Sequence, residues 1–242
     1  MNNIKNPLLI LAFLIVIPNF IYAKESNDET LNKQITQSYK ALYNFNFTFS
    51  KEIIDSLKAK NKKTIDILIL NINYKWWKII SNDTENNKKD FLVSLDRLKN
   101  NMQGFSEEKK NILLVYYYTY YCRYHLMYRN YFKVLVHYPK FERLIKKCKT
   151  KKTSHKEKIG LIKNFFLYLQ YRHISLNSEK KNHYLKNIER IAESENPIVK
   201  TESNYLLMKI YAELEDSPRK AREHQFFLHK KYPDNWVFNS IF

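Results

Sequence analysis

The chain has 242 residues, 44% hydrophobic and 27% charged, a balance that allows a buried core and sets it apart from disordered chains. Only Gly104 and Gly160 are glycines, which excludes the glycine-rich loops of dinucleotide folds and P-loop enzymes and the G-x-S-x-G turn of α/β-hydrolases. The net charge of +18 permits an anionic partner, but the excess is mostly lysine, whereas nucleic-acid binders favour arginine.

Residues 1–23 have the layout of a secretory signal peptide. Lys5 supplies the positive charge, Leu8–Ile17 is an apolar run of ten residues, and Ala23 is a small residue at the expected cleavage edge. The run is shorter than the roughly 20 residues of a spanning helix, although an uncleaved anchor remains the alternative. Because no cysteine lies near the cleavage edge, we expect a non-lipidated bacterial protein, periplasmic or secreted. Its mature domain covers residues 24–242 and has no transmembrane segment.

Helical periodicity with short links recurs through this domain and predicts about ten helices, in about five antiparallel pairs. In chain order, the predicted helices cover 26–44, 50–60, 64–81, 82–104, 106–131, a segment from Asn130 that Pro139 interrupts, 154–174, and three more opened by Ser178, Asn196-Pro197 and Ser217-Pro218, the last ending at Tyr232.

Several of these boundaries carry specific end signals. Ser106 followed by Glu107 and Glu108 is a helix start, and Ser154 with Glu157 forms a capping box. Gly104 is placed to end the preceding helix in a left-handed conformation.

The helix after Ser106 is the most aromatic stretch of the chain. Residues 116–131 include eight tyrosines, which leave almost no polar face. A helix that is apolar nearly all round is normally buried between neighbours, so we expect it at the centre of an all-α stack.

The C-terminal segment Thr201–Asp234 resembles a degenerate tetratricopeptide repeat, a family that packs two helices in about 34 residues. Ala221 matches the small residue of the second helix, and Pro233 matches the closing proline twelve positions later. Tyr205 or Tyr211 matches the aromatic residue of the first helix.

The segment also departs from the family pattern. Asp216 stands where the family has a loop glycine, and Met208 or Lys209 where its first helix has a small residue. The resemblance implies an all-α, right-handed α-α superhelix, a TPR-like solenoid, whose concave face binds a protein or peptide partner. It implies no catalytic residues.

Two adjacent tryptophans are candidates for different roles. Trp76 is in register with Ile69, Ile72 and Ile80, and we expect it in the core. Trp77 points to another face, and we expect it half-exposed at a groove, as a candidate partner-binding anchor.

A basic run covers residues 140–163, where ten lysines and arginines face two glutamates. Such a run could steer an acidic polymer or surface, or it could be a solvated link in a chain of lysine-rich composition. Its candidate partner-binding residues are Lys146, Lys147, Lys149, Lys151 and Lys152.

Cys122 and Cys148 could form a disulfide in an exported protein or remain free thiols, and the sequence leaves both open. The seven histidines form no metal-binding motif, and no local motif arranges a nucleophile. We therefore predict no enzyme activity, no metal and no cofactor. The sequence favours a protein-interaction or scaffolding module of the cell envelope, with binding of an anionic polymer or surface through residues 140–163 as the alternative.

Overall fold

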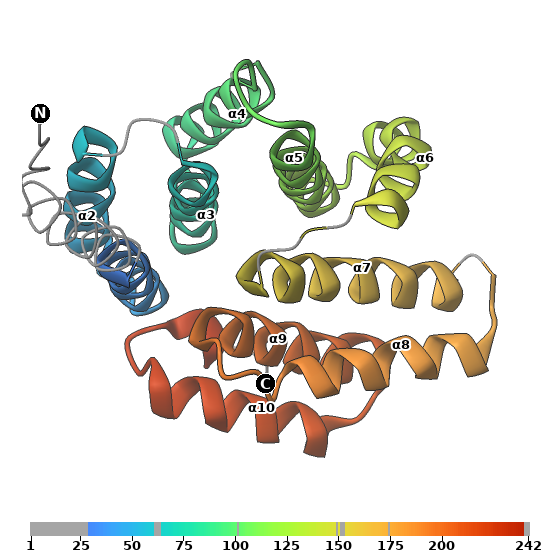
Figure 1. The fold of residues 1–242 in the computed structure, drawn as a ribbon. Helices are drawn as coiled ribbons and strands as arrows, with labels where there is room; N and C mark the ends of the chain where they lie inside the picture. Colours follow the sequence, from blue (N-terminus) through green and yellow to red (C-terminus); the bar gives the residue numbers. More distant parts are fainter. Residues whose placement is uncertain are drawn as a thin grey trace, which may run out of the picture.

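The computed structural model describes residues 29–60, 64–100, 102–148, 150, 153–173 and 175–239, and within these all regular structure is helical (Figure 1). The prediction of an all-α chain is confirmed. The predicted signal peptide and the candidate residues Lys149, Lys151 and Lys152 lie outside the described residues.

Ten helices are packed in sequential pairs along the described part of the chain, as the sequence predicts. A first helix over 29–43 is followed by α2 (Phe47–Lys60), α3 (Ile65–Ser81), α4 (Glu85–Asn100), α5 (Glu107–Met127), α6 (Tyr131–Lys147), α7 (Thr153–His173), α8 (Ser178–Ile191), α9 (Pro197–Lys209) and α10 (Pro218–Lys231). The π-helical turn η1 (Ile210–Leu214) extends α9, and the 3-10 turn η2 (Trp236–Phe238) follows α10.

The end signals place most of these helices correctly. The Ser106 hydroxyl accepts from the backbone N–H of Lys109, and the Asn196 side chain accepts from that of Ile198 at 3.0 Å, directly before Pro197. Gly104 adopts the left-handed φ of +83°, although α4 ends four residues earlier, at Asn100.

Besides the end of α4, two further predictions about the helices are wrong. Helix α2 begins at Phe47 rather than Ser50, because the turn is complete by Asn46, whose side chain accepts from the backbone N–H of Phe49 at 3.2 Å. Helix α6 continues through Pro139 without a break. Pro139 and Leu135 are both exposed, so water can bind the Leu135 carbonyl that lacks its helical N–H partner.

The tyrosine-rich helix α5 is central, as predicted. It packs against α3, α4, α6 and α7, and Tyr116, Tyr117, Tyr118 and Tyr120 are all buried. Burial decreases along the C-terminal part of α5, contrary to the prediction of a helix buried throughout. Residues 121–124 are half-buried, and Leu126 and Met127 are exposed.

The chain curves until its C-terminal helices lie against its N-terminal ones (Figure 1). The Asn235 amide donates to the backbone carbonyl of Tyr43 at 2.8 Å, and the rings of Tyr43 and Tyr232 are 5.4 Å apart. The Phe238 ring lies 5.7 Å from that of Trp77 in α3. One core cluster therefore joins the two ends of the described chain.

A second core cluster links α7, α8, α9 and α10. Beside it, the Glu215 carboxylate binds three groups: the Tyr168 hydroxyl at 2.6 Å, Arg172 at 2.9 Å and Lys181 at 2.8 Å. This carboxylate therefore ties η1 to α7 and α8.

Candidate functional site

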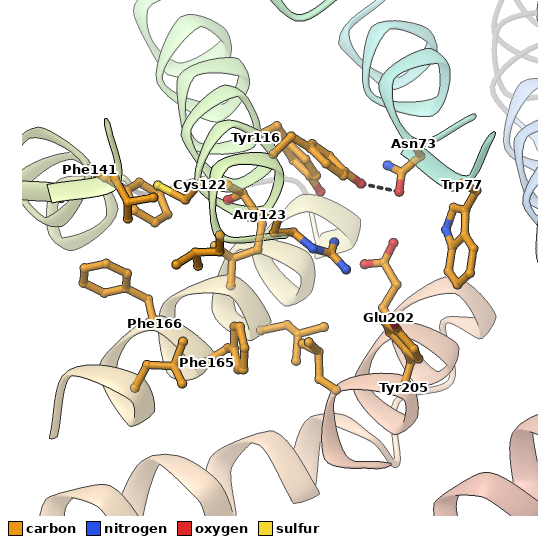
Figure 2. Close-up of a pocket in the computed structure, with 18 of the residues that line it drawn as sticks. Asn73, Trp77, Tyr116, Cys122, Arg123, Phe141, Phe165, Phe166, Glu202 and Tyr205 are labelled. Carbon is orange, nitrogen blue, oxygen red and sulfur yellow. Dashed lines mark hydrogen bonds between the residues drawn. The ribbon is translucent and has the colours of Figure 1, made fainter. Parts of the chain in front are cut away.

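The curvature leaves a partly open cavity of about 270 Å³ between the helices. Its walls come from the first helix, α3, α5, α6, α7, α9 and η2 (Figure 2). Segments far apart in the sequence thus meet at one largely aromatic and aliphatic space.

Trp77 forms part of this wall, but it is buried, with 5% of its surface exposed. The expectation of a half-exposed Trp77 is wrong, because η2 and α9 cover it: the rings of Tyr205 and Phe238 each lie 5.7 Å from its own. Trp76 is buried against Phe91 and Tyr120, as predicted for a core residue.

A buried amide in the wall of the cavity joins three helices. The Asn73 amide of α3 donates to the Tyr39 hydroxyl at 3.0 Å and to the Ile69 carbonyl at 3.1 Å, while the Tyr120 hydroxyl of α5 donates to the Asn73 carbonyl oxygen (Figure 2). All three side chains are buried, so this network fixes the position of α5 relative to the first helix.

Two charged side chains enter the cavity from opposite sides. Figure 2 shows the Arg123 guanidinium of α5 and the Glu202 carboxylate of α9 pointing toward each other. Arg123 lies over the rings of Trp76 and Tyr120, at 5.0 and 5.6 Å, and Glu202 accepts from the Tyr43 hydroxyl at 3.2 Å. The cavity therefore offers a cation and an anion in largely apolar surroundings.

Some polar groups of the wall have no hydrogen-bond partner within the described residues. They are the hydroxyls of Tyr116 and Tyr138 and the side-chain oxygen of Gln170. Buried polar groups are normally satisfied, so such atoms call for an explanation.

Burial, with a further contribution from the negative charge of Glu202, raises the pKa of Tyr43 and Tyr116 well above the ordinary value of 10. Burial and Glu202 also raise the pKa of Tyr120, which the positive charge of Arg123 lowers in part. These phenols keep their protons at neutral pH, and Tyr43 and Tyr120 use them to donate to Glu202 and Asn73.

A separate surface feature lies at the end of α5 and along α6. We call it the α5–α6 apolar patch; its exposed side chains are Leu126, Met127, Tyr131, Phe132, Leu135 and Val136. The four residues on α6 are one and four positions apart, so they share one helix face. Helix α6 packs mainly against α5 and α7, and Figure 1 shows it at the outer edge of the molecule.

The basic run is only partly a surface feature. Lys146 binds Glu142 at 2.6 Å, and the hydrogen bond raises the pKa of the lysine. Lys147 is exposed. Lys158 is buried with its ammonium 4.9 Å from the Tyr39 ring centre, so it does not belong to an exposed basic surface.

The two cysteines are free thiols and half-buried, so the structure has no disulfide between them. Cys122 lines the cavity, and burial raises its thiol pKa to about 11. In the described part of the chain, no group of three or more His, Cys, Asp or Glu side chains is arranged to hold a metal ion. No helix there is both long and apolar enough to cross a membrane.

Comparison of the chain with protein-family models, curated proteins and solved structures finds no match. The likeness to tetratricopeptide repeats therefore stays a prediction from the residues quoted above.

Sequence reasoning did not identify Arg123, Glu202, Asn73 or Tyr116 as site residues. The only signals were a polar Asn73 inside an apolar helix and Arg123 inside the tyrosine run. Glu202 carries no local signal, because its position in the cavity follows from the return of α9 toward α3.

Proposed function

We propose that this chain is an exported helical-repeat protein that binds a protein partner through the α5–α6 apolar patch. The observation that carries the proposal is the exposure of the patch: Phe132 is 76% and Leu135 66% exposed. A contiguous apolar face of this kind on a folded protein is typical of an interaction site.

We further propose that the helix pairs are TPR-like and form a right-handed superhelix. Two positions support this. Ala221 is fully buried where the family has its small residue, and Asp216 has a left-handed φ of +46° where the family has glycine. The predicted signal peptide supports an exported location, periplasmic or secreted.

Charge indicates the chemistry of the partner. Between residues 126 and 147 there are six lysines and arginines and one glutamate. Arg129, Lys133 and Lys140, which flank the patch, are all exposed. We therefore propose a partner segment with an apolar face and acidic neighbours, because such a segment would match both the patch and its charge.

The test is photo-crosslinking of the mature protein in its own cell envelope. A photoreactive phenylalanine analogue replaces Phe132, and in a matched control it replaces Phe226 on α10, which is 69% exposed. We expect one acidic protein to be crosslinked from position 132 and not from 226, and the adduct to disappear when Leu135→Asp is added.

Equal adducts at both positions, or no adduct at position 132, would reject the patch as the docking site. An adduct with lipid or an acidic polymer alone would favour the second candidate.

The second candidate is an anionic polymer or surface bound by residues 140–163. The exposure of Lys140, Lys147 and Lys156 favours it. Affinity for polyphosphate should then fall steeply with salt, and the combined Lys146→Glu and Lys147→Glu variant should bind more weakly than a control with Lys186→Glu and Lys230→Glu. Equal affinity of the two variants would reject this role for the run.

A further inference from the structure

The central cavity is a second candidate binding site, which shares Leu126 with the α5–α6 apolar patch, and it contains a charged side chain that forms no ion pair within the described residues. Among the described residues no ion pair joins Arg123 to a carboxylate. Its guanidinium instead lies over the rings of Trp76 and Tyr120. Contact with ring faces leaves guanidinium N–H donors available, and a carboxylate is the acceptor that fits them best.

Glu202 faces Arg123 from α9 (Figure 2). Within the part of the chain that the structure describes it accepts one hydrogen bond, from Tyr43, although a carboxylate can accept about four. Trp77 and Tyr205 line the same end of the cavity, and aromatic faces attract cations. This end therefore suits an ammonium group.

A third group supplies independent evidence of a missing ligand. The Tyr116 side chain lines the cavity and is 4% exposed, yet its hydroxyl has no partner within the described residues. The phenol remains protonated at neutral pH, because burial raises its pKa. Tyr116 thus has an unused donor in the wall of the same cavity that Arg123 and Glu202 line.

Most of the remaining wall is apolar, although Thr119, Tyr138, Gln170, His173 and Thr201 also line the cavity. Phe165 and Phe166 of α7 and Phe141 of α6 form its far side (Figure 2), and Leu161 of α7 also lines the cavity. The volume of about 270 Å³ is just below the range of roughly 300–1,000 Å³ for drug-sized ligands. A ligand of this cavity is therefore small and largely apolar.

We propose that the cavity binds a small amphipathic zwitterion of the hydrophobic α-amino acid class. Its carboxylate binds Arg123 and the Tyr116 hydroxyl, its ammonium binds Glu202, and its side chain lies against Leu161 and Phe165. A zwitterion satisfies both charges at once, whereas an ion of one sign would leave the opposite charge unpaired in an apolar site.

The test is isothermal titration of the mature wild-type chain with three matched probes. They are L-phenylalanine, 3-phenylpropanoate, which lacks the ammonium group, and 2-phenylethylamine, which lacks the carboxylate. We expect phenylalanine to bind about ten- to one-hundredfold more tightly than either analogue, as hydrogen bonds to charged groups typically contribute. Equal affinity for all three probes, tightest binding of 3-phenylpropanoate, or no binding of phenylalanine would overturn the proposal.

Variants of Arg123 and Glu202 then test which group of the ligand each of these two side chains binds. Glu202→Gln should remove the preference for phenylalanine over 3-phenylpropanoate, because it removes the partner of the ammonium group. Arg123→Gln should remove the preference for phenylalanine over 2-phenylethylamine, because it removes the partner of the carboxylate. The controls are Arg129→Gln and Glu195→Gln, which change exposed charges outside the cavity wall and should keep both preferences. Unchanged preferences in both cavity variants would overturn the assignment. The wild-type comparison decides the ligand class even if a variant fails to fold.

Discussion

Replacement of Phe238 by alanine tests the closure of the chain. The ring is fully buried and has three aromatic neighbours: Trp77 at 5.7 Å, Tyr205 at 5.7 Å and Tyr232 at 5.9 Å. Truncation of such a ring costs about 3–5 kcal/mol, because the cavity it leaves cannot fully collapse. Phe238→Ala should therefore lower the free energy of unfolding by about 4 kcal/mol, a large share of the 5–15 kcal/mol of an ordinary domain.

The assay is urea unfolding followed by circular dichroism, with a thermal melt in parallel. A loss of this size lowers Tm by roughly 8–16 °C in a chain of this length. Trp236→Ala is the matched control, since Trp236 lies in the same 3-10 turn but is 52% exposed, and its loss should cost under about 1 kcal/mol. If the two variants were equally stable, the packing of η2 onto α3 would be refuted.

Three further predictions concern the remaining packing. Burial by itself raises the pKa of Glu215, but hydrogen bonds from Lys181 and Tyr168 hold it below its ordinary value of 4.5. The stabilisation is therefore present above pH 4.5 and is lost as the pH falls through the lower folded pKa, and Glu215→Gln should destabilise the protein by about 2 kcal/mol at pH 7. Asp216→Gly should stabilise it by up to about 1 kcal/mol, and Asp216→Val should destabilise it, because residue 216 has positive φ. Tyr117→Ala should cost about 3–5 kcal/mol, since this ring is buried, and Tyr121→Ala less, since that one is half-buried.

Chemical denaturation at pH 7 measures all these changes, and a series from pH 6 to 3 tests Glu215. A wild-type advantage over Glu215→Gln that stayed constant across the series would contradict the carboxylate network. Equal stabilities of the glycine and valine variants at 216 would contradict the turn conformation. Changes under about 0.5 kcal/mol at both Tyr117 and Tyr121 would mean that the tyrosine face is exposed.

Local signals were sufficient to predict the helices. Ser106, Asn196-Pro197 and Pro218 mark helix starts by hydrogen bonding and fixed φ, which act within a few residues. The predicted break at Pro139 was wrong, because the effect of a proline depends on whether the carbonyl four residues earlier can reach water. That exposure is set by the tertiary structure and not by the local sequence.

The cavity could not be predicted in the same way. Trp77 is buried by Tyr205 and Phe238, which come from the other end of the chain. The approach of Arg123 to Glu202 likewise depends on how α9 returns to α5. Sequence patterns identify which face of a helix is apolar, but not which distant helix will cover it.

Hydrogen exchange tests the closure of the chain most directly, because the central cavity depends on it. The measurement compares Phe238→Ala with Ile188→Ala, a truncation in the second core cluster. Closure predicts that Phe238→Ala selectively speeds exchange in the helix over 29–43 and in α3, whereas Ile188→Ala acts mainly on α7 and α8. If exchange over 29–43 changed no more in Phe238→Ala than in Ile188→Ala, the two ends of the chain would not be coupled, and a cavity formed between them would be contradicted.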